Sequence, residues 1–222
     1  MYNLTFDTTG SSCSIILQND EEIESVFEKS MDFGQSEELM IQIKNMLEAN
    51  NLSFSDIEAL FVCVGPGSFT GVRSSISAAR IFGVACPSLK IGGVSAFDAY
   101  INTLSKEEIA DVNAVIIETR RDDFYVQLFD ENLNKINEAC ALERATIIEN
   151  LKNFGCAVSL IGDGVERFLS TPSGLCLKTI KMLDSLPIKV LAKTGLRQLK
   201  DKKLNYPKPL YLRAPDVSMP KA

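Results

Sequence analysis

Apolar and polar residues alternate along the chain in a pattern that occurs twice. Residues 4–23 and residues 114–136 each predict a strand, a polar turn and a second strand. Asp7 and Thr8 open the first turn, and Glu118 and Thr119 stand at the matching positions of the second. The repeat predicts two halves that begin with the same β-hairpin.

The segments that follow each hairpin also correspond. Each half continues with a helical pattern, an apolar strand and a Gly-x-Gly turn that precedes another helix. In the first half these are residues 36–50 with Ser36 as the expected N-cap, residues 59–64, and Gly65-Pro66-Gly67. In the second they are residues 145–154, residues 157–161, and Gly162-Asp163-Gly164.

This ordered recurrence predicts an α/β protein with two duplicated lobes, each a mixed sheet with helices. The boundary is expected in the polar stretch 102–113, which gives an N-terminal lobe of residues 1–105 and a C-terminal lobe of residues 106–222. Two such lobes resemble the actin-like ATPase (ribonuclease H-like) class, in which the hairpin turns face a nucleotide. A proline-rich segment at 205–215 is expected to be extended and to pack back on the body.

The helix expected at residues 69–85 has two sides that are poor in charge. Val72, Ile76, Ala79 and Gly83 form one stripe, which we expect to lie on the sheet. A second side carries small and apolar residues: Gly71, Ser74, Ala78, Ile81, Phe82 and Ala85. Apolar surface left in water costs roughly 25 cal/mol per Å², so this second side should be covered. Arg73, Ser77 and Arg80 form a third, polar side.

Two kinds of cover are open at this point. The neighbouring helix at 36–49 could pack there alone, or together with helices of a second polypeptide. In that neighbouring helix, Leu39, Met40, Ile43, Met46 and Leu47 are expected to face inward. Ile41 points the other way, toward the charged side that includes Lys44.

The turn at residues 65–68 is a weak candidate for an anion site. Gly71 is followed by Val72 and Arg73, so the lysine of a Walker A loop is absent. Gly67, Ser68 and Thr70 could still offer backbone N–H groups to a phosphate, with Asp7 and Thr8 across the cleft. The alternative is that Ser68 only caps the helix and that Asp7 only closes its own turn.

Composition narrows the chemistry further. The 222 residues include no histidine, which excludes Ser-His-Asp and Cys-His catalysis, a histidine general base and a mixed histidine zinc site. The six cysteines are widely spaced and are expected to be buried or inert thiols. A net charge of −6 argues against strong nucleic-acid binding by the chain alone. No apolar run is long enough for a membrane span and no signal peptide is evident, so a cytoplasmic protein is expected.

Three stretches carry a resemblance to a known family. Residues 4–17, residues 59–83 with the string GPGSFTGVR, and residues 209–221 closely resemble the TsaB (YeaZ) family. That resemblance implies a non-catalytic partner and scaffold subunit of the complex that transfers threonylcarbamoyl to adenosine in tRNA. The family's usual histidine before the first helix is replaced here in the run Phe33-Gly34-Gln35, which leaves the role of that histidine in doubt.

The resemblance also implies partners. The chain is expected to bind and activate TsaD through the first-lobe helices, to form a homodimer through an overlapping surface, and to join further subunits. ATP and metal are expected on the partner subunit, with no cofactor, no metal site and no catalytic residue in this chain. The expected interface consists of Ile41, Lys44, Gly71, Arg73, Ser74, Ala78, Ile81 and Phe82. Arg73 could form a salt bridge across it or remain solvated.

Two alternatives stay open. The chain could be an active magnesium-dependent kinase or ATPase of the actin-like superfamily, in which Asp7 and Glu118 would hold metal or water. Separately, Lys189, Lys193, Arg197 and Lys200 follow one side of the helix expected after Pro187. That row could contact tRNA, or it could be an ordinary solvated face.

Overall fold

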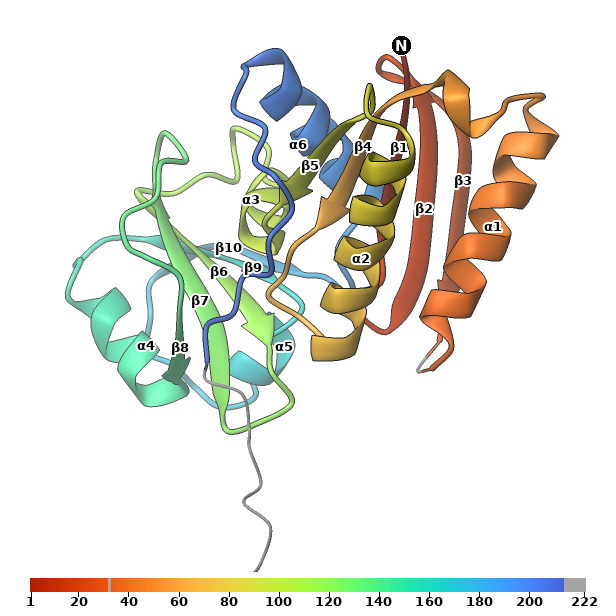
Figure 1. The fold of residues 1–222 in the computed structure, drawn as a ribbon. Coiled ribbons are helices and arrows are strands. Elements are labelled where there is room, and N and C mark those ends of the chain that lie inside the picture. Colours follow the sequence, from red (N-terminus) through yellow and green to blue (C-terminus); the bar gives the residue numbers. More distant parts are fainter. Residues whose placement is uncertain (32, 214–222) are drawn as a thin grey trace, which may run out of the picture.

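The computed structural model describes residues 1–31 and 33–213, which form two lobes side by side (Figure 1). Each lobe contains one mixed five-stranded sheet. The strand order is β3-β2-β1-β4-β5 in the first and, read from the matching edge, β8-β7-β6-β9-β10 in the second. In both sheets the first three strands of the lobe pair antiparallel and the last two join in parallel. The predicted duplication and α/β class are therefore confirmed.

The elements of the first lobe follow the expected order. They are β1 (Tyr2–Asp7), β2 (Ser12–Asn19), β3 (Glu22–Ser30), α1 (Gln35–Ala49), a 3-10 turn (Phe54–Asp56), β4 (Ile57–Cys63), α2 (Phe69–Ala85), β5 (Lys90–Val94) and α3 (Ala96–Ile101).

The second lobe repeats this order, and its first two helices are shorter than those of the first lobe. Its elements are β6 (Val112–Glu118), β7 (Asp123–Asp130), β8 (Cys140–Glu143), α4 (Arg144–Lys152), β9 (Val158–Gly162), α5 (Val165–Phe168), β10 (Leu177–Met182) and α6 (Ile188–Lys200).

The central strands of the first sheet are buried on both faces. Along β4, Leu60 and Val62 pack in the cluster that α1 and α2 cover, whereas Phe61 and Cys63 pack in the cluster that contains α3 and α6. The period of two places alternate side chains on opposite faces. Because α1 and α2 lie together on one face, their remaining sides point to solvent (Figure 1).

Helix α2 sits on the sheet with the predicted stripe. Val72, Ile76 and Ala79 are buried in the first-lobe core, and Gly83 lies against the side chain of Ile91. Ser68 is its N-cap, with the hydroxyl accepting a hydrogen bond from the Gly71 amide at 3.4 Å. Both predictions are confirmed.

Helix α1 begins differently from the prediction. Its N-cap is Gly34, in the left-handed conformation at φ 82°, and not Ser36. Ser36 lies within the first turn, where its hydroxyl donates to the Ser74 hydroxyl of α2 at 2.7 Å. Glycine can take the positive φ that this entry to the helix requires, and no side chain caps the first turn among the described residues.

The last helix returns to the first lobe. Helix α6 packs on β1, β2, β4 and β5, while α3 packs against β6 and β9 of the second sheet. Gly195 allows the close approach, because a Cβ there would lie 2.5 Å from Cγ of Phe61. The range 106–222, expected to form the second lobe, therefore supplies one layer of the first.

A C-terminal strap, residues 205–213, then runs in extended form along the first lobe (Figure 1). The Gly93 amide donates to the Asn205 carbonyl at 2.8 Å, and the Leu210 amide donates to the Val64 carbonyl at 2.9 Å. The prediction that this segment is extended and packs on the body is confirmed. Residues 214–221 of the family-like motif lie outside the described residues. In the part of the chain that is described, no helix is long and apolar enough to cross a membrane.

Candidate partner interface and interlobe cleft

The turn between β1 and β2 is fastened to helix α2. The Thr8 hydroxyl donates to the Gly71 carbonyl at 2.8 Å and also hydrogen-bonds the Ser75 hydroxyl at 2.7 Å. Asp7 is buried, and its Oδ1 accepts the Thr9 amide at 2.8 Å, which is an Asx turn. Burial raises the pKa of Asp7, and hydrogen bonds from Thr9 and Thr8 oppose that rise only in part.

The Gly-Pro-Gly turn meets this hairpin turn directly. The Ser68 amide donates to the Thr9 carbonyl at 2.7 Å, and a Cβ on Gly67 would lie at that same distance from the same oxygen. The structure thus brings together four of the five expected anion-site residues, Asp7, Thr8, Gly67 and Ser68, whereas Thr70 lies on the exposed surface between α1 and α2. However, the amides of Ser68 and Gly71 and the Thr8 hydroxyl are already used within the chain. This geometry favours a structural turn over a phosphate cradle.

The second hairpin turn is held by charge. Glu118 forms a two-pronged ion pair with Arg167 of α5, with N–O distances of 2.7 and 2.8 Å. Partial burial would raise the pKa of Glu118, but the hydrogen bonds from Arg167 and from the Arg120 amide outweigh it and lower that pKa. Arg167 also covers the ring of Phe124 at 3.8 Å. The negative charge of the Glu118 carboxylate is therefore balanced by the guanidinium of Arg167.

Asp163 and Tyr100 also belong to the cleft, although neither is among the site residues expected from the sequence. Asp163 Oδ1 accepts the Glu118 amide at 2.9 Å. Loss of water around Asp163 raises its pKa to about 6, which the Glu118 amide and Tyr100 hydrogen bonds counteract. The sequence feature that could have identified Asp163 is its position at the centre of the second Gly-x-Gly turn, where the first turn has Pro66.

These groups line a cavity of about 430 Å³ between the lobes. Asp7, Glu118 and Asp163 contribute carboxylates, and Arg120 and Arg121 contribute positive charge. Among residues 1–31 and 33–213, no three acidic or cysteine side chains are grouped closely enough to hold a metal ion. The cavity has the size of a small-molecule site.

A shallow groove separates α1 and α2 on the solvent side of the first lobe. It is lined by Ser36, Leu39, Met40, Phe69, Thr70, Arg73, Ser74, Ser77, Ala78 and Ile81. Ile81 is 66% exposed, Phe69 49% and Met40 48%. Four of the expected interface residues, Arg73, Ser74, Ala78 and Ile81, therefore line one open surface.

The remaining expected interface residues lie elsewhere. Ile41, which is 55% exposed, and Lys44, which pairs with Glu48, are on the solvent side of α1 but do not line the groove. Phe82 is half-buried, because its ring stacks on Phe54 at 4.2 Å between centroids. Met40, expected to face inward, is largely exposed.

Gly71 requires a correction. It is buried, and a Cβ at this position would overlap the carbonyl oxygen of Thr8. The helical wheel placed Gly71 on the side open to a partner, but the β1–β2 turn occupies that position. Gly71 is therefore an internal contact and not an interface residue.

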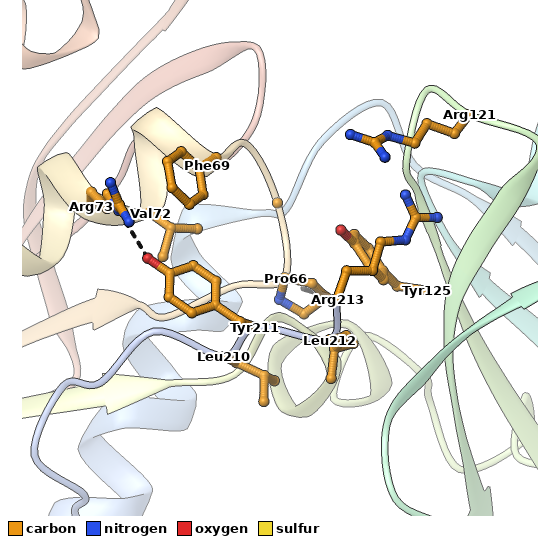
Figure 2. A pocket seen from close by; sticks show the side chains of 11 residues that line it. Pro66, Phe69, Val72, Arg73, Arg121, Tyr125, Leu210, Tyr211, Leu212 and Arg213 are labelled. Carbon is orange, nitrogen blue, oxygen red and sulfur yellow. Dashed lines mark hydrogen bonds between the residues drawn. The ribbon is translucent and has the colours of Figure 1, made fainter. Parts of the chain in front are cut away.

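Arg73 is held in place by aromatic neighbours. Its Nε donates to the Tyr211 hydroxyl at 3.0 Å, and its guanidinium lies 3.7 Å above the Phe69 ring centroid (Figure 2). The Tyr211 and Phe69 centroids are 5.8 Å apart. The side chain is thus neither a freely solvated arginine nor, among the described residues, part of an ion pair.

The basic row on α6 is exposed as the solvated interpretation requires. Lys189, Lys193 and Arg197 face solvent, and Lys200 pairs with Glu21 at 2.6 Å. The six cysteines are free thiols; Cys13 and Cys63 are buried, whereas Cys176 is exposed. Burial raises the pKa of Cys13 to about 11, so that thiol stays protonated at neutral pH.

Two lobes with one strand order, joined at a cleft, define the class of two-lobed α/β proteins to which the actin-like ATPases belong. The chain belongs to the family whose model is described as "TsaD: tRNA N6-adenosine threonylcarbamoyltransferase", which matches residues 34–219. Its relatives place it in the TsaB, or YeaZ, branch, as the sequence motifs implied.

Individual relatives match most of the chain. TsaB of Escherichia coli (strain K12), a tRNA threonylcarbamoyladenosine biosynthesis protein, is 27% identical over 221 residues, which cover 95% of this chain and 94% of that protein. YeaZ from Pseudomonas aeruginosa superposes with a TM-score of 0.78 at 18% identity, over 95% of this chain and 99% of that one. The fold extends to Lmo2764 from Listeria monocytogenes, a candidate N-acetylmannosamine kinase, with a TM-score of 0.51 at 10% identity over 91% of this chain and 100% of that one.

Proposed function

We propose that this chain is a non-catalytic partner and scaffold subunit in the synthesis of threonylcarbamoyladenosine on tRNA, and that it binds and activates TsaD. Family membership and the nearly full-length likeness to Escherichia coli TsaB support the pathway. The observation that carries the docking role is the open groove between α1 and α2.

The groove has the properties of a protein-binding surface. Ile81, Met40 and Phe69 expose apolar side chains around it, and Ala78 leaves room for a close approach. Contiguous apolar surface rimmed by polar residues is typical of interaction sites. The serine and arginine side chains at its edge provide that polar rim. A second copy of the chain could use an overlapping part of the same surface to form a homodimer.

The cleft supports the absence of independent catalysis. The turn that would face a phosphate instead donates and accepts hydrogen bonds within the chain, and Glu118 is paired with Arg167. ATP and metal would then be held by TsaD. With a net charge of −6, this chain would contribute little tRNA affinity alone. Cytoplasmic localisation stays a prediction.

The groove is tested by filling it. We expect Ala78→Trp to weaken binding to TsaD at least ~10-fold, because a large side chain at the centre of an interface blocks close packing. Ala145→Trp, on an exposed position of α4, is the matched control and should bind normally. Isothermal titration of each purified variant with TsaD measures the effect. Equal affinity of both variants would move the interface away from α1 and α2.

The competing function is an active magnesium-dependent kinase or ATPase, and one observation favours it. Asp7, Glu118 and Asp163 line the same cavity, whose size would admit a small substrate. Such an enzyme should hydrolyse ATP as an isolated chain and lose that activity on Asp7→Asn. We expect no turnover from the isolated chain in a phosphate-release assay. Turnover that Asp7→Asn abolishes would favour the enzyme.

A further inference from the structure

A second pocket lies beside the α1–α2 groove, between the start of α2, the β6–β7 turn and the C-terminal strap (Figure 2). Its volume is about 370 Å³. The residues lining it are Pro66, Gly67, Phe69, Val72, Arg73, Arg121, Tyr125, Leu210, Tyr211, Leu212 and Arg213. Three of them are arginines and none is acidic, although the whole chain carries a net charge of −6. The pocket therefore has apolar walls and presents the positive charge of Arg73, on a protein whose net charge is negative.

Arg73 is preorganised for an anion. Its stacking on Phe69 and its hydrogen bond from Nε to Tyr211 fix the plane of the guanidinium. The bond to Tyr211 uses Nε and leaves the terminal N–H groups for another acceptor. No described carboxylate forms an ion pair with this side chain. A fixed guanidinium edge of this kind matches the two oxygens of a carboxylate.

The strap holds Tyr211 where Arg73 needs it. The Leu210 amide is bonded to Val64, and Arg80 donates twice to the Pro207 carbonyl, at 2.7 and 3.1 Å. Arg213, two residues after Tyr211, pairs with Asp123 of the second lobe and lies over the Tyr125 ring at 5.4 Å. Tyr211 is thus anchored on both sides, once in each lobe.

The far wall carries two further arginines, and the charge of Arg213 is balanced by Asp123. Arg121 and Arg213 lie across the pocket from Arg73, with Tyr125 beneath them (Figure 2). Leu210, Leu212 and Val72 provide apolar surface between the two walls. An apolar side chain next to a carboxylate would satisfy both features.

The pocket and the groove form one surface. Phe69 and Arg73 line both of them. A protein seated in the groove between α1 and α2 would therefore reach the pocket without leaving the surface. This continuity, together with the positive charge of Arg73, favours an occupant that is part of that same protein.

We propose that the pocket between α2 and the C-terminal strap receives an acidic segment of the docked partner, with a carboxylate on Arg73 and an adjoining apolar side chain against Val72, Leu210 and Leu212. This inference rests on the proposed function, because the partner is the TsaD subunit that docks on the groove. Tyr211 acts as a positioning residue for Arg73.

The test measures TsaD affinity by titration for Arg73→Gln and Tyr211→Phe. Arg73→Gln should weaken binding about 10-fold to 100-fold, since a charge-assisted hydrogen bond and its Coulomb attraction are lost. Tyr211→Phe keeps the ring and removes the hydroxyl, so it should cause a smaller loss. The double variant should be no weaker than Arg73→Gln, because Tyr211 acts through Arg73.

Matched controls are available on the same molecule. Tyr206→Phe makes the same change elsewhere on the strap, and Arg197→Gln removes an exposed arginine from α6. Both should bind TsaD as the unaltered chain does. Raising sodium chloride from about 0.05 M to about 0.5 M should weaken the unaltered complex more than the Arg73→Gln complex.

A spectroscopic readout separates positioning from folding. The Nε–H signal of Arg73 in ¹⁵N NMR should shift in Tyr211→Phe, while the thermal unfolding midpoint stays the same. On addition of TsaD, the terminal N–H groups of Arg73 should become protected from exchange.

The outcomes distinguish the two proposals. If Ala78→Trp abolishes TsaD binding but Arg73→Gln and Tyr211→Phe bind within about twofold of the unaltered chain, the pocket is not part of the interface. The docking role would then stand and this inference would fail. If Ala78→Trp and the unaltered chain bind TsaD equally well, or if the unaltered chain does not bind it, the proposed function itself fails.

Discussion

The two lobes share one strand order but join their hairpin turn to the following helix in different ways. In the first lobe, Gly71 lets the turn touch α2, and the Thr8 hydroxyl bonds to the helix backbone. Four residues after the second Gly-x-Gly, at the position that matches Gly71, stands Phe168, which packs edge-on against Phe124. There the turn reaches α5 through the ion pair between Glu118 and Arg167.

This difference accompanies a difference in helix length. Helix α2 has 17 residues and α5 has 4, and α1 has 15 residues where α4 has 9. Among the described elements, the first lobe alone presents two long neighbouring helices with apolar residues on their outer sides (Figure 1). A duplicated fold can thus carry the proposed docking surface on one lobe, while the other lobe contributes Glu118 and Asp163 to the cleft.

The largest effect is expected from a side chain at Gly71, which would disrupt the contact between α2 and the β1–β2 turn in the first lobe. Gly71→Leu would drive its Cβ into the Thr8 carbonyl, and we expect a loss of more than ~4 kcal/mol in the free energy of unfolding. Gly10→Ala, in the same turn, has no heavy atom within 4 Å of the new Cβ. It should change stability by less than about 0.5 kcal/mol. Urea denaturation of both variants measures this, and a stable Gly71→Leu protein would contradict the close contact.

The two lobes also differ in the middle residue of the Gly-x-Gly turn, which is Pro66 in the first lobe and Asp163 in the second. Because the pKa of Asp163 in the folded protein is raised from 3.8 to about 6, the folded state binds the proton more tightly than the unfolded state. This contribution stabilises the protein at low pH and is lost as the pH rises from about 4 to above about 6.

Asp163→Asn should remove that pH dependence. Relative to the unaltered chain, the variant should gain roughly 2 to 3 kcal/mol of stability between about pH 4 and about pH 8. Glu118, whose pKa is lowered, contributes with the opposite sign in both proteins and largely cancels. Denaturation curves across this pH range provide the measurement. Parallel pH profiles for the two proteins would show that Asp163 is not desolvated.

The smallest expected effect compares the two threonines of the hairpin turns. Thr8→Val removes a buried hydroxyl that bonds to Gly71 and Ser75, and should cost about 1 to 3 kcal/mol. Thr119, whose hydroxyl donates to Asp123, is only half-buried, so Thr119→Val should cost less than about 1 kcal/mol. Thermal unfolding of the pair gives the ranking. Equal losses would mean that both turns are fastened alike.

Much of the fold could be predicted because it depends on the local periodicity of apolar and polar residues. Alternation in the strands, the stripe of Val72, Ile76 and Ala79, and the cap at Ser68 all follow from one element and the sheet beneath it. The duplicated order of elements then fixes two equivalent lobes. These features depend on neighbouring positions in the sequence, which a single chain displays directly.

The site was less predictable because it depends on contacts between distant segments. A helical wheel shows which residues share a side, but it cannot show that the β1–β2 turn covers Gly71 or that Phe54 covers Phe82. Tyr211 lies 138 positions from Arg73, so no spacing rule joins them. The groove residues Ser74, Ala78 and Ile81 were found because their exposure follows from α2 alone.

The return of α6 to the first lobe has a consequence for synthesis of the protein. One face of the first sheet is covered by a helix near the end of the chain, where Gly195 meets Phe61. While a ribosome is still making the second lobe, that face has no native cover and is available to chaperones. The lobe that is translated first is therefore completed last.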